Sequence, residues 1–278
     1  MALLLAGLAA LAYGLSDFVG GLASRRASAW SVAFVGQIAS ALCTVGVAVL
    51  RSGDPGGPDF AWAAVAGVGQ GLGTAFLYRG LATGRMGVVA PISAVGAAII
   101  PVAVGVSAGE RPSMWVWIGV LSAMPGIWLV SSEPSAGQPT GATAEGILDG
   151  ILAGAGFGVL FAALGQIPDS AGLWPVAAAQ AVSIVTIVVA AAALGAAWIP
   201  RERGAAWGAL AGLLGAAAAV LFLLATQRGY LTVAGVITSL YPAATVLLAA
   251  TVLRERIHTI QAVGLALCAA AVALVAAG

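Results

Sequence analysis

The sequence predicts an all-α membrane protein with ten transmembrane helices in two inverted five-helix repeats. Of its 278 residues, 61% are hydrophobic and 8% are charged. Apolar runs recur along the whole length, each near the ~20 residues that a membrane-crossing helix needs. The runs are long and rich in Ala, Leu and Val, which favours helices over the ~10-residue alternating strands of a β-barrel. The third observation is an internal repeat.

The second half of the chain repeats the first half. Glu110 matches Glu255 at a shift of 145 residues (255 − 110 = 145), and Tyr13 matches Phe157 at a shift of 144 (157 − 13 = 144). An odd number of spans per copy places the second copy upside down in the bilayer. Inverted repeats with a site between them are common in secondary transporters. The repeat therefore predicts transport by alternating access.

The apolar runs also place the individual spans and the loops between them. The expected spans are residues 2–23, 30–50, 60–82, 87–108, 114–131, 146–165, 173–195, 204–227, 232–252 and 258–277. Two stretches have the turn residues that are typical of loops, 51–59 and 131–149. The second stretch joins the copies, so we expect a first repeat at 1–133, a linker at 134–145 and a second repeat at 146–278.

Asp17 is the acidic side chain that we expect deepest in a span. It lies about seven residues inside the end near Arg25, roughly 10 Å at ~1.5 Å per residue, where a carboxylate is costly and usually functional or paired. Its repeat equivalent is Phe161, and that of Arg79 is Leu224. Both charges occur only in the first copy, so we expect Asp17 and Arg79 to compensate one another directly or through water. The pair could be structural, a gate, or a substrate-binding carboxylate with a steering arginine.

Polar and aromatic side chains within the spans are the candidates for a substrate pocket. Gln70, Thr74 and Tyr78 follow one another at i, i+4 and i+8, so they form one stripe on a helix. Such a stripe faces the bundle interior, where it either binds substrate or makes hydrogen bonds between helices. The full set expected to bind substrate is Tyr13, Ser16, Asp17, Gln70, Thr74, Tyr78, Ser93, Phe157, Phe161, Thr238, Ser239 and Tyr241.

Prolines and glycines within the spans predict bends and close packing. Pro91 and Pro242 each remove a backbone donor and free a carbonyl one turn earlier. Each bend is either purely structural or a gating hinge with a substrate-facing carbonyl. Small residues spaced four apart, such as Gly208 and Gly212, let helix backbones approach closely.

Five short motifs carry a family resemblance. They are Tyr13-Gly14 with Ser16-Asp17-Phe18, residues 87–92 (Gly-Val-Val-Ala-Pro-Ile), Gly109-Glu110-Arg111-Pro112, Ser239-Leu240-Tyr241-Pro242 and Arg254-Glu255-Arg256. With these motifs the chain resembles the EamA-type branch of the drug/metabolite transporter superfamily. The resemblance implies a ten-helix bundle with a central cavity between the copies. It also implies substrates among amino acids, metabolites, sugars and cationic drugs.

The function predicted from these features is secondary transport of a small metabolite, amino acid or drug-like molecule across the plasma membrane, in the direction of export. The alternatives are a non-transporting structural or regulatory membrane protein, and an uncoupled sugar or metabolite importer. We find no His-Glu-x-x-His or Gly-x-Ser-x-Gly motif, so an enzyme is not expected. We expect no cofactor and no metal site. The expected partners are a small-molecule substrate and membrane lipid, and not nucleic acid, because the net charge is +1.

The arginines predict the orientation in the membrane. One face has Arg51, Arg111 and Arg228, and the other has Arg25, Arg26, Arg79, Arg85, Arg201, Arg203, Arg254 and Arg256. The positive-inside rule then places the face with eight arginines in the cytoplasm and both termini outside, whereas the family resemblance implies the reverse. We favour the charge count. A C-terminal reporter enzyme that works only outside the cytoplasm is expected to be active, and activity of a cytoplasm-only reporter would contradict the assignment.

Overall fold

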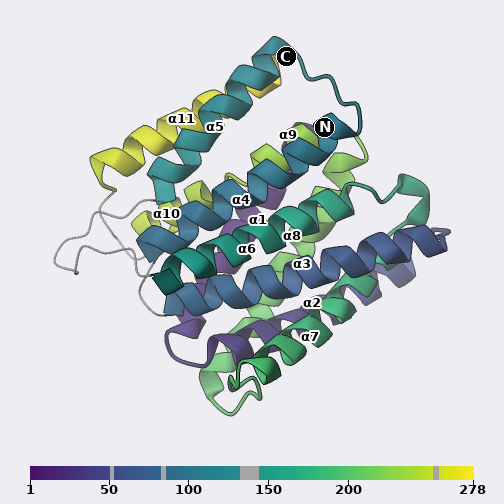
Figure 1. Cartoon of the computed structure of the whole chain (residues 1–278), viewed down its shortest axis with the longest axis vertical. Coiled ribbons are helices and arrows are strands. Elements are labelled where there is room, and N and C mark those ends of the chain that lie inside the picture. The colour runs from purple at the N-terminus through teal and green to yellow at the C-terminus, as the bar shows by residue number, and fades with distance from the viewer. Residues whose placement is uncertain (51–52, 83–85, 132–143, 253–256) are drawn as a thin grey trace.

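A computed structural model describes residues 1–50, 53–82, 86–131, 144–252 and 257–278, and within these residues the fold is all-α, as predicted (Figure 1). The helices are α1 (Ala2–Ser24), α2 (Ala29–Leu50), α3 (Gly57–Ala82), α4 (Met86–Ser107), α5 (Met114–Ser131), α6 (Ala144–Leu164), α7 (Trp174–Ala193), α8 (Trp207–Thr226), α9 (Leu231–Thr238), α10 (Tyr241–Val252) and α11 (Thr259–Ala277). Two short 3-10 helices, η1 (Asp169–Ala171) and η2 (Arg203–Ala206), lie in the loops before α7 and α8.

The ten predicted spans are confirmed, with two differences. Nine described segments are long and apolar enough to cross a membrane when Leu231–Val252 is counted as one, and α4 adds the shorter apolar stretch Ile92–Ser107. The ninth span is broken into α9 and α10. The two loops are shorter than predicted, because α3 already begins at Gly57 and α6 at Ala144. Asp149 is therefore a helical residue, six positions into α6.

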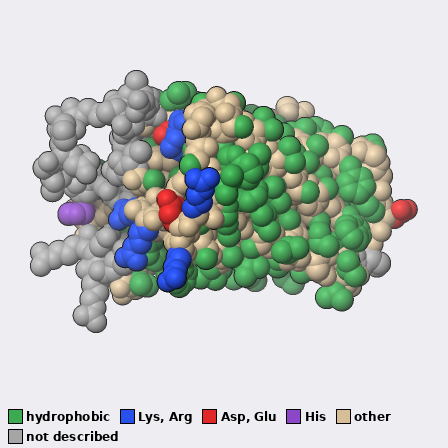
Figure 2. Space-filling view, turned by 90° about the horizontal axis from the view of Figure 1, so that it is seen from below, with side chains coloured by type: hydrophobic (Ala, Val, Ile, Leu, Met, Phe, Trp, Pro, Cys, Tyr) green, Lys and Arg blue, Asp and Glu red, His purple; other side chains and the backbone are tan. Residues whose placement is uncertain are grey.

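The outer surface has the two zones that a membrane protein needs. Figure 2 shows a broad hydrophobic belt around the bundle, with arginine side chains gathered at one end of it. Large side chains such as Leu42 and Val49 are exposed within the belt, and a continuous apolar surface of this size is typical of lipid contact. We call the end where α1, α3 and α5 finish the arginine-rich face. The opposite end, where both chain termini lie (Figure 1), is the termini face.

The two five-helix copies interlock in symmetric pairs of contacts. Helix α1 packs on α8, and its repeat equivalent α6 packs on α3, the equivalent of α8. In the same way α2 packs on α8 and α3 packs on α7. Helices α2 and α7, α4 and α9, and α5 and α11 are equivalent helices that meet each other. This pattern is that of an inverted repeat folded around a central axis.

Glycines make the closest of these contacts possible. A Cβ added at Gly212 of α8 would lie 2.7 Å from the Cα of Gly36 of α2 and would overlap its carbonyl oxygen. On the other interface, a Cβ at Gly156 of α6 would lie 2.6 Å from the carbonyl oxygen of Gly69 of α3. Lipid offers no hydrophobic drive to bring helices together, so close backbone packing supplies much of the association energy. The small residues on these helices therefore act in packing between the copies.

Gly212→Ala is expected to destabilise the protein by about 1–3 kcal/mol, the usual cost of overpacking, because its methyl group meets backbone that cannot move aside. Gly46→Ala is the matched control, since nothing lies within 4 Å of a Cβ at that position. The control is expected to leave stability unchanged or to raise it by up to about 1 kcal/mol. The measurement is the Tm of the purified protein in detergent. Equal Tm changes for both variants would contradict the packing role.

Candidate functional site

Asp17 lies where two cavities inside the bundle meet. One cavity, of about 30 Å³, is bounded by α1, α2, α3, α6 and α8. The other, of about 70 Å³, is bounded by α1, α3, α4, α5, α10 and α11. Asp17 is the residue that lines both. These volumes hold a few water molecules, whereas a pocket for a drug-sized molecule needs about 300 Å³ or more, so the bundle is closed around Asp17 in this conformation.

The first cavity gathers seven of the twelve predicted substrate residues. It is lined by Tyr13, Ser16, Asp17, Gln70, Thr74, Tyr78 and Phe157. Two of these also tie helices together: Ser16 Oγ donates to the carbonyl of Ala211 at 2.8 Å, and Gln70 Nε2 donates to Gln37 Oε1 at 3.3 Å. The predicted stripe on α3 therefore faces the cavity and also makes a hydrogen bond between helices. Its role in binding substrate stays a prediction.

The second cavity extends from Asp17 toward the arginine-rich face. Ser93, Tyr241 and Pro242, three of the predicted site residues, line it. Thr245 and Gln261 also line it and were not predicted. Thr245 Oγ1 donates to the carbonyl of Gly14 at 3.2 Å and so links α10 to α1. A lone threonine or glutamine near a span end has no spacing that distinguishes it in the sequence.

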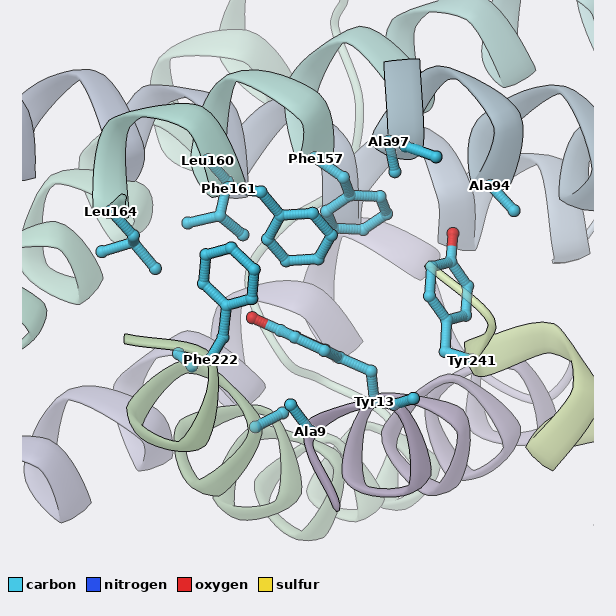
Figure 3. Close-up of a cluster of buried hydrophobic side chains, with 14 of the residues drawn as sticks. Ala9, Tyr13, Ala94, Ala97, Phe157, Leu160, Phe161, Leu164, Phe222 and Tyr241 are labelled. Atoms are coloured by element: carbon cyan, nitrogen blue, oxygen red, sulfur yellow. The ribbon is translucent and has the colours of Figure 1, made fainter. Parts of the chain in front are cut away.

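Aromatic rings fill the centre of the bundle beside Asp17 (Figure 3). The ring centroids of Tyr13 and Phe161 are 5.6 Å apart, and Phe161 stacks on Phe222 at 4.6 Å. Phe157 meets Tyr241 edge to face at 6.5 Å. Phe161 lines neither cavity, so the structure places this predicted substrate residue in the packed core. It occupies the position that corresponds to Asp17, so the second copy has an aromatic stack where the first has a carboxylate.

The broken ninth span brings polar groups into the core next to Tyr241. Helix α9 ends at Thr238 and α10 begins at Tyr241, which places Pro242 in the first turn of α10, where a missing N–H costs little. Thr238 and Ser239 are fully buried and line neither cavity. Thr238 Oγ1 donates to the carbonyl of Ala6 at 3.4 Å. The hydroxyl of Ser239 is buried without a partner among the described residues. The side chain of Pro91, the other predicted hinge, lies outside the described residues.

The predicted pairing of Asp17 with Arg79 is wrong, because Arg79 pairs with Asp149. Arg79 Nε donates to Asp149 Oδ1 at 2.9 Å, and its Nη2 contacts the same oxygen. The guanidinium also lies 4.6 Å from the ring centroid of Phe76. Asp149 is 3% exposed and Arg79 is 32% exposed. Asp149 was the last residue of the stretch 131–149 that was expected to be a loop, so the sequence offered no second buried acid to compete for Arg79.

Asp17 is left with a carboxylate that no described residue binds. Among the hydrogen bonds and ion pairs of the described residues, none reaches its oxygen atoms. The hydroxyl groups of Tyr13 and Tyr241, on either side of the aromatic cluster, are likewise buried without a partner in this part of the chain. The two cavities around Asp17 therefore combine an acidic group that has no described partner with hydroxyl groups that have none and with aromatic side chains. Such a combination of polar and apolar groups is typical of ligand-binding surfaces.

A carboxylate of the first copy binds the start of a helix of the second copy at the termini face. The backbone N–H groups of Leu231 and Thr232, at the start of α9, donate to the carboxylate of Glu110, with 2.9 Å from Thr232. A carboxylate at this position satisfies free donors and matches the helix dipole. Gly105 leaves room for it, because a Cβ there would overlap the carboxylate. Glu110 belongs to one of the motifs that carry the family resemblance, but the sequence analysis predicted no role for it. Its repeat equivalent, Glu255, lies outside the described residues.

Inverted repeats around a central polar site define a membrane transporter. The chain belongs to the EamA-like transporter family, which matches residues 1–132 and 144–277. It is thus a multi-pass membrane protein of the drug/metabolite transporter superfamily.

No curated protein matches the chain. One solved crystal structure, whose description names no function, is similar with a TM-score of 0.67 and 17% identity, covering 97% of this chain and 95% of the other. At this identity the likeness shows the fold alone.

Asp149→Asn and Arg79→Leu are each expected to destabilise the protein by about 3 kcal/mol, because each leaves a buried or half-buried charge alone. The value is at the low end because Arg79 is partly exposed. In a double-mutant cycle, the loss for the double variant should be smaller than the sum of the single losses by 1 kcal/mol or more. The measurement is denaturant unfolding in detergent.

The matched control for this cycle is Asp17→Asn combined with Arg79→Leu. These two changes are expected to be additive, because the two side chains do not interact. Additivity in the Arg79/Asp149 cycle, or coupling in the Asp17/Arg79 cycle, would contradict the assignment of the ion pair.

Proposed function

We propose that this protein is a secondary transporter that exports a small cationic or amine-bearing molecule across the plasma membrane in exchange for protons, with Asp17 as the shared binding group. The observation that carries the proposal is the Asp17 carboxylate, which faces two cavities and has no partner among the described residues. An acidic group inside a membrane is expensive to maintain and usually serves function. A proton or a cationic ligand would neutralise it.

The walls around Asp17 favour an organic cation. Tyr13, Tyr78 and Phe157 contribute ring faces to the same cavity, and such faces attract cations. Arg79 is held by Asp149 and lines neither cavity, so it does not bring positive charge to the site. A net negative and aromatic cavity binds anions poorly. This combination supports amines over carboxylates or phosphates as substrates.

The exchange of substrate for protons is based on a single acidic group, Asp17, in the two cavities. Asp17 can bind either a proton or the cationic substrate, so one displaces the other. If each passage across the membrane occurs with the carboxylate neutralised, inward proton movement drives the cation outward. Within the described part of the chain, no other acidic side chain lines either cavity.

The positions of two polar contacts between the copies, one near each face, support alternating access. Arg79 and Asp149 join α3 to α6 near the arginine-rich face, and Glu110 joins the end of α4 to α9 at the termini face. In a rocking motion of one copy against the other, opening one face separates the contact at that face and leaves the opposite contact in place. Both contacts are formed in this structure, in agreement with cavities too small for a substrate.

Asp17→Asn is expected to lower substrate-driven proton movement at least tenfold, because an asparagine amide cannot bind a proton and release it when the substrate binds. The measurement uses proteoliposomes with an internal pH dye, and the probes are a panel of primary amines, amino acids and tetraphenylphosphonium. Asp54→Asn is the matched control, since Asp54 is an exposed aspartate in a loop, and it should transport like the wild type. Full proton movement by Asp17→Asn would refute the assignment of Asp17, and Asp17-dependent transport without proton movement would refute the exchange.

A further inference from the structure

A separate groove of about 440 Å³ lies on the outer surface at the arginine-rich face. It runs between the end of α1 and the start of α8, and none of its lining residues borders the Asp17 cavities. Val19, Leu22 and Ala23 of α1 form one wall, and Arg26, Arg203 and Trp207 surround the polar end. The groove is much larger than the cavities at Asp17, and it faces the surroundings of the protein rather than its centre.

The polar end of the groove carries positive charge that the described protein does not neutralise. Arg26 and Arg203 are exposed, and neither guanidinium group forms a hydrogen bond or ion pair with another described residue. The neighbouring acid, Glu202, accepts a hydrogen bond from the backbone N–H of Ser28 at 3.0 Å. Arginine is well suited to phosphate groups, because its planar guanidinium donates two parallel hydrogen bonds. The arginine pair therefore fits a phosphate ligand.

The groove changes from polar to apolar over the height of a lipid headgroup region. Val19 lies five residues before the end of α1 at Ser24, which is about 7.5 Å at ~1.5 Å per residue, and Arg26 follows two residues after that end. Val19 and Leu22 thus form the apolar part of the groove, and Arg26 and Arg203 form its polar end. Figure 2 shows arginine side chains gathered at the edge of the hydrophobic surface. Trp207 is 62% exposed at this boundary, where tryptophan is typically found at the level of the headgroups. A soluble phosphate compound would make no use of the apolar wall.

We propose that this groove binds an anionic phospholipid, with its phosphate between Arg26 and Arg203 and its first acyl carbons along Val19 and Leu22. Basic pockets between transmembrane helices at the charged face are suited to such lipids. The groove is formed by α1 of the first copy and by the segment that begins α8 of the second, so a bound lipid bridges the two copies. The proposal does not depend on the transported substrate.

The test measures lipid binding to the full-length protein in detergent by native mass spectrometry, with phosphatidylglycerol and phosphatidylcholine as probes. Wild-type protein should bind phosphatidylglycerol in preference to phosphatidylcholine. Arg26→Gln with Arg203→Gln should weaken phosphatidylglycerol binding about 30-fold, the factor expected for two arginines near an anionic headgroup. Arg201→Gln is the matched control, because Arg201 is exposed in the same loop but does not line the groove. It should change binding by about twofold or less.

Gly204→Phe tests the location of the site without removing charge. Gly204 lines the groove, and a Cβ there meets no atom closer than 3.4 Å, so the new ring has room to occupy the groove. It should weaken phosphatidylglycerol binding as strongly as the arginine changes. Equal binding by wild type and both groove variants would overturn the proposal. So would equal losses for Arg201→Gln and the arginine pair, or full competition by glycerol phosphate, which has no acyl chain.

Discussion

The cost of holding an ionised side chain away from water is the constraint that organises this bundle. Lipid and packed helices solvate charge poorly, so a buried acid needs a cation, donors or a function. Asp149 has Arg79, and Glu110 has the free N–H groups at the start of α9. Asp17 has neither among the described residues. The other two acids serve as contacts between the copies, so Asp17 is the one of these three without a partner among the described residues.

Close packing and polar contacts serve different parts of the interface between the copies. Glycines bring α2 onto α8 and α3 onto α6 along their lengths, through contacts that have no charge and tolerate no added methyl group. The contacts of Arg79 and Glu110 lie near opposite ends. The middle of this interface is therefore held by apolar packing, while a polar interaction between the copies lies near each end.

The sequence predicted the fold well and the site in part, for physical reasons. Span length and hydropathy are set by the bilayer, so the all-α fold and the ten spans could be read directly from the apolar runs. Pairing between charges depends on which helices meet, and the sequence did not contain that information for Arg79. A lone aspartate at the start of a span, such as Asp149, reads as a loop residue. The stripe on α3 was found because its spacing is regular, whereas Thr245 and Gln261 follow no pattern.

The two copies share a backbone plan but differ in the chemistry of equivalent positions. Phe161 stands where the inverted symmetry would place a second Asp17, and it stacks on Phe222 in a fully buried pair. A symmetric pair of carboxylates would need two neutralising charges in one closed bundle. With one carboxylate and one aromatic stack, a single proton or cation suffices, and the stack fills the volume on the side toward the termini face. The asymmetry therefore leaves the inverted repeat with one carboxylate at this pair of positions, and that carboxylate lies nearer the arginine-rich face, where the second cavity extends.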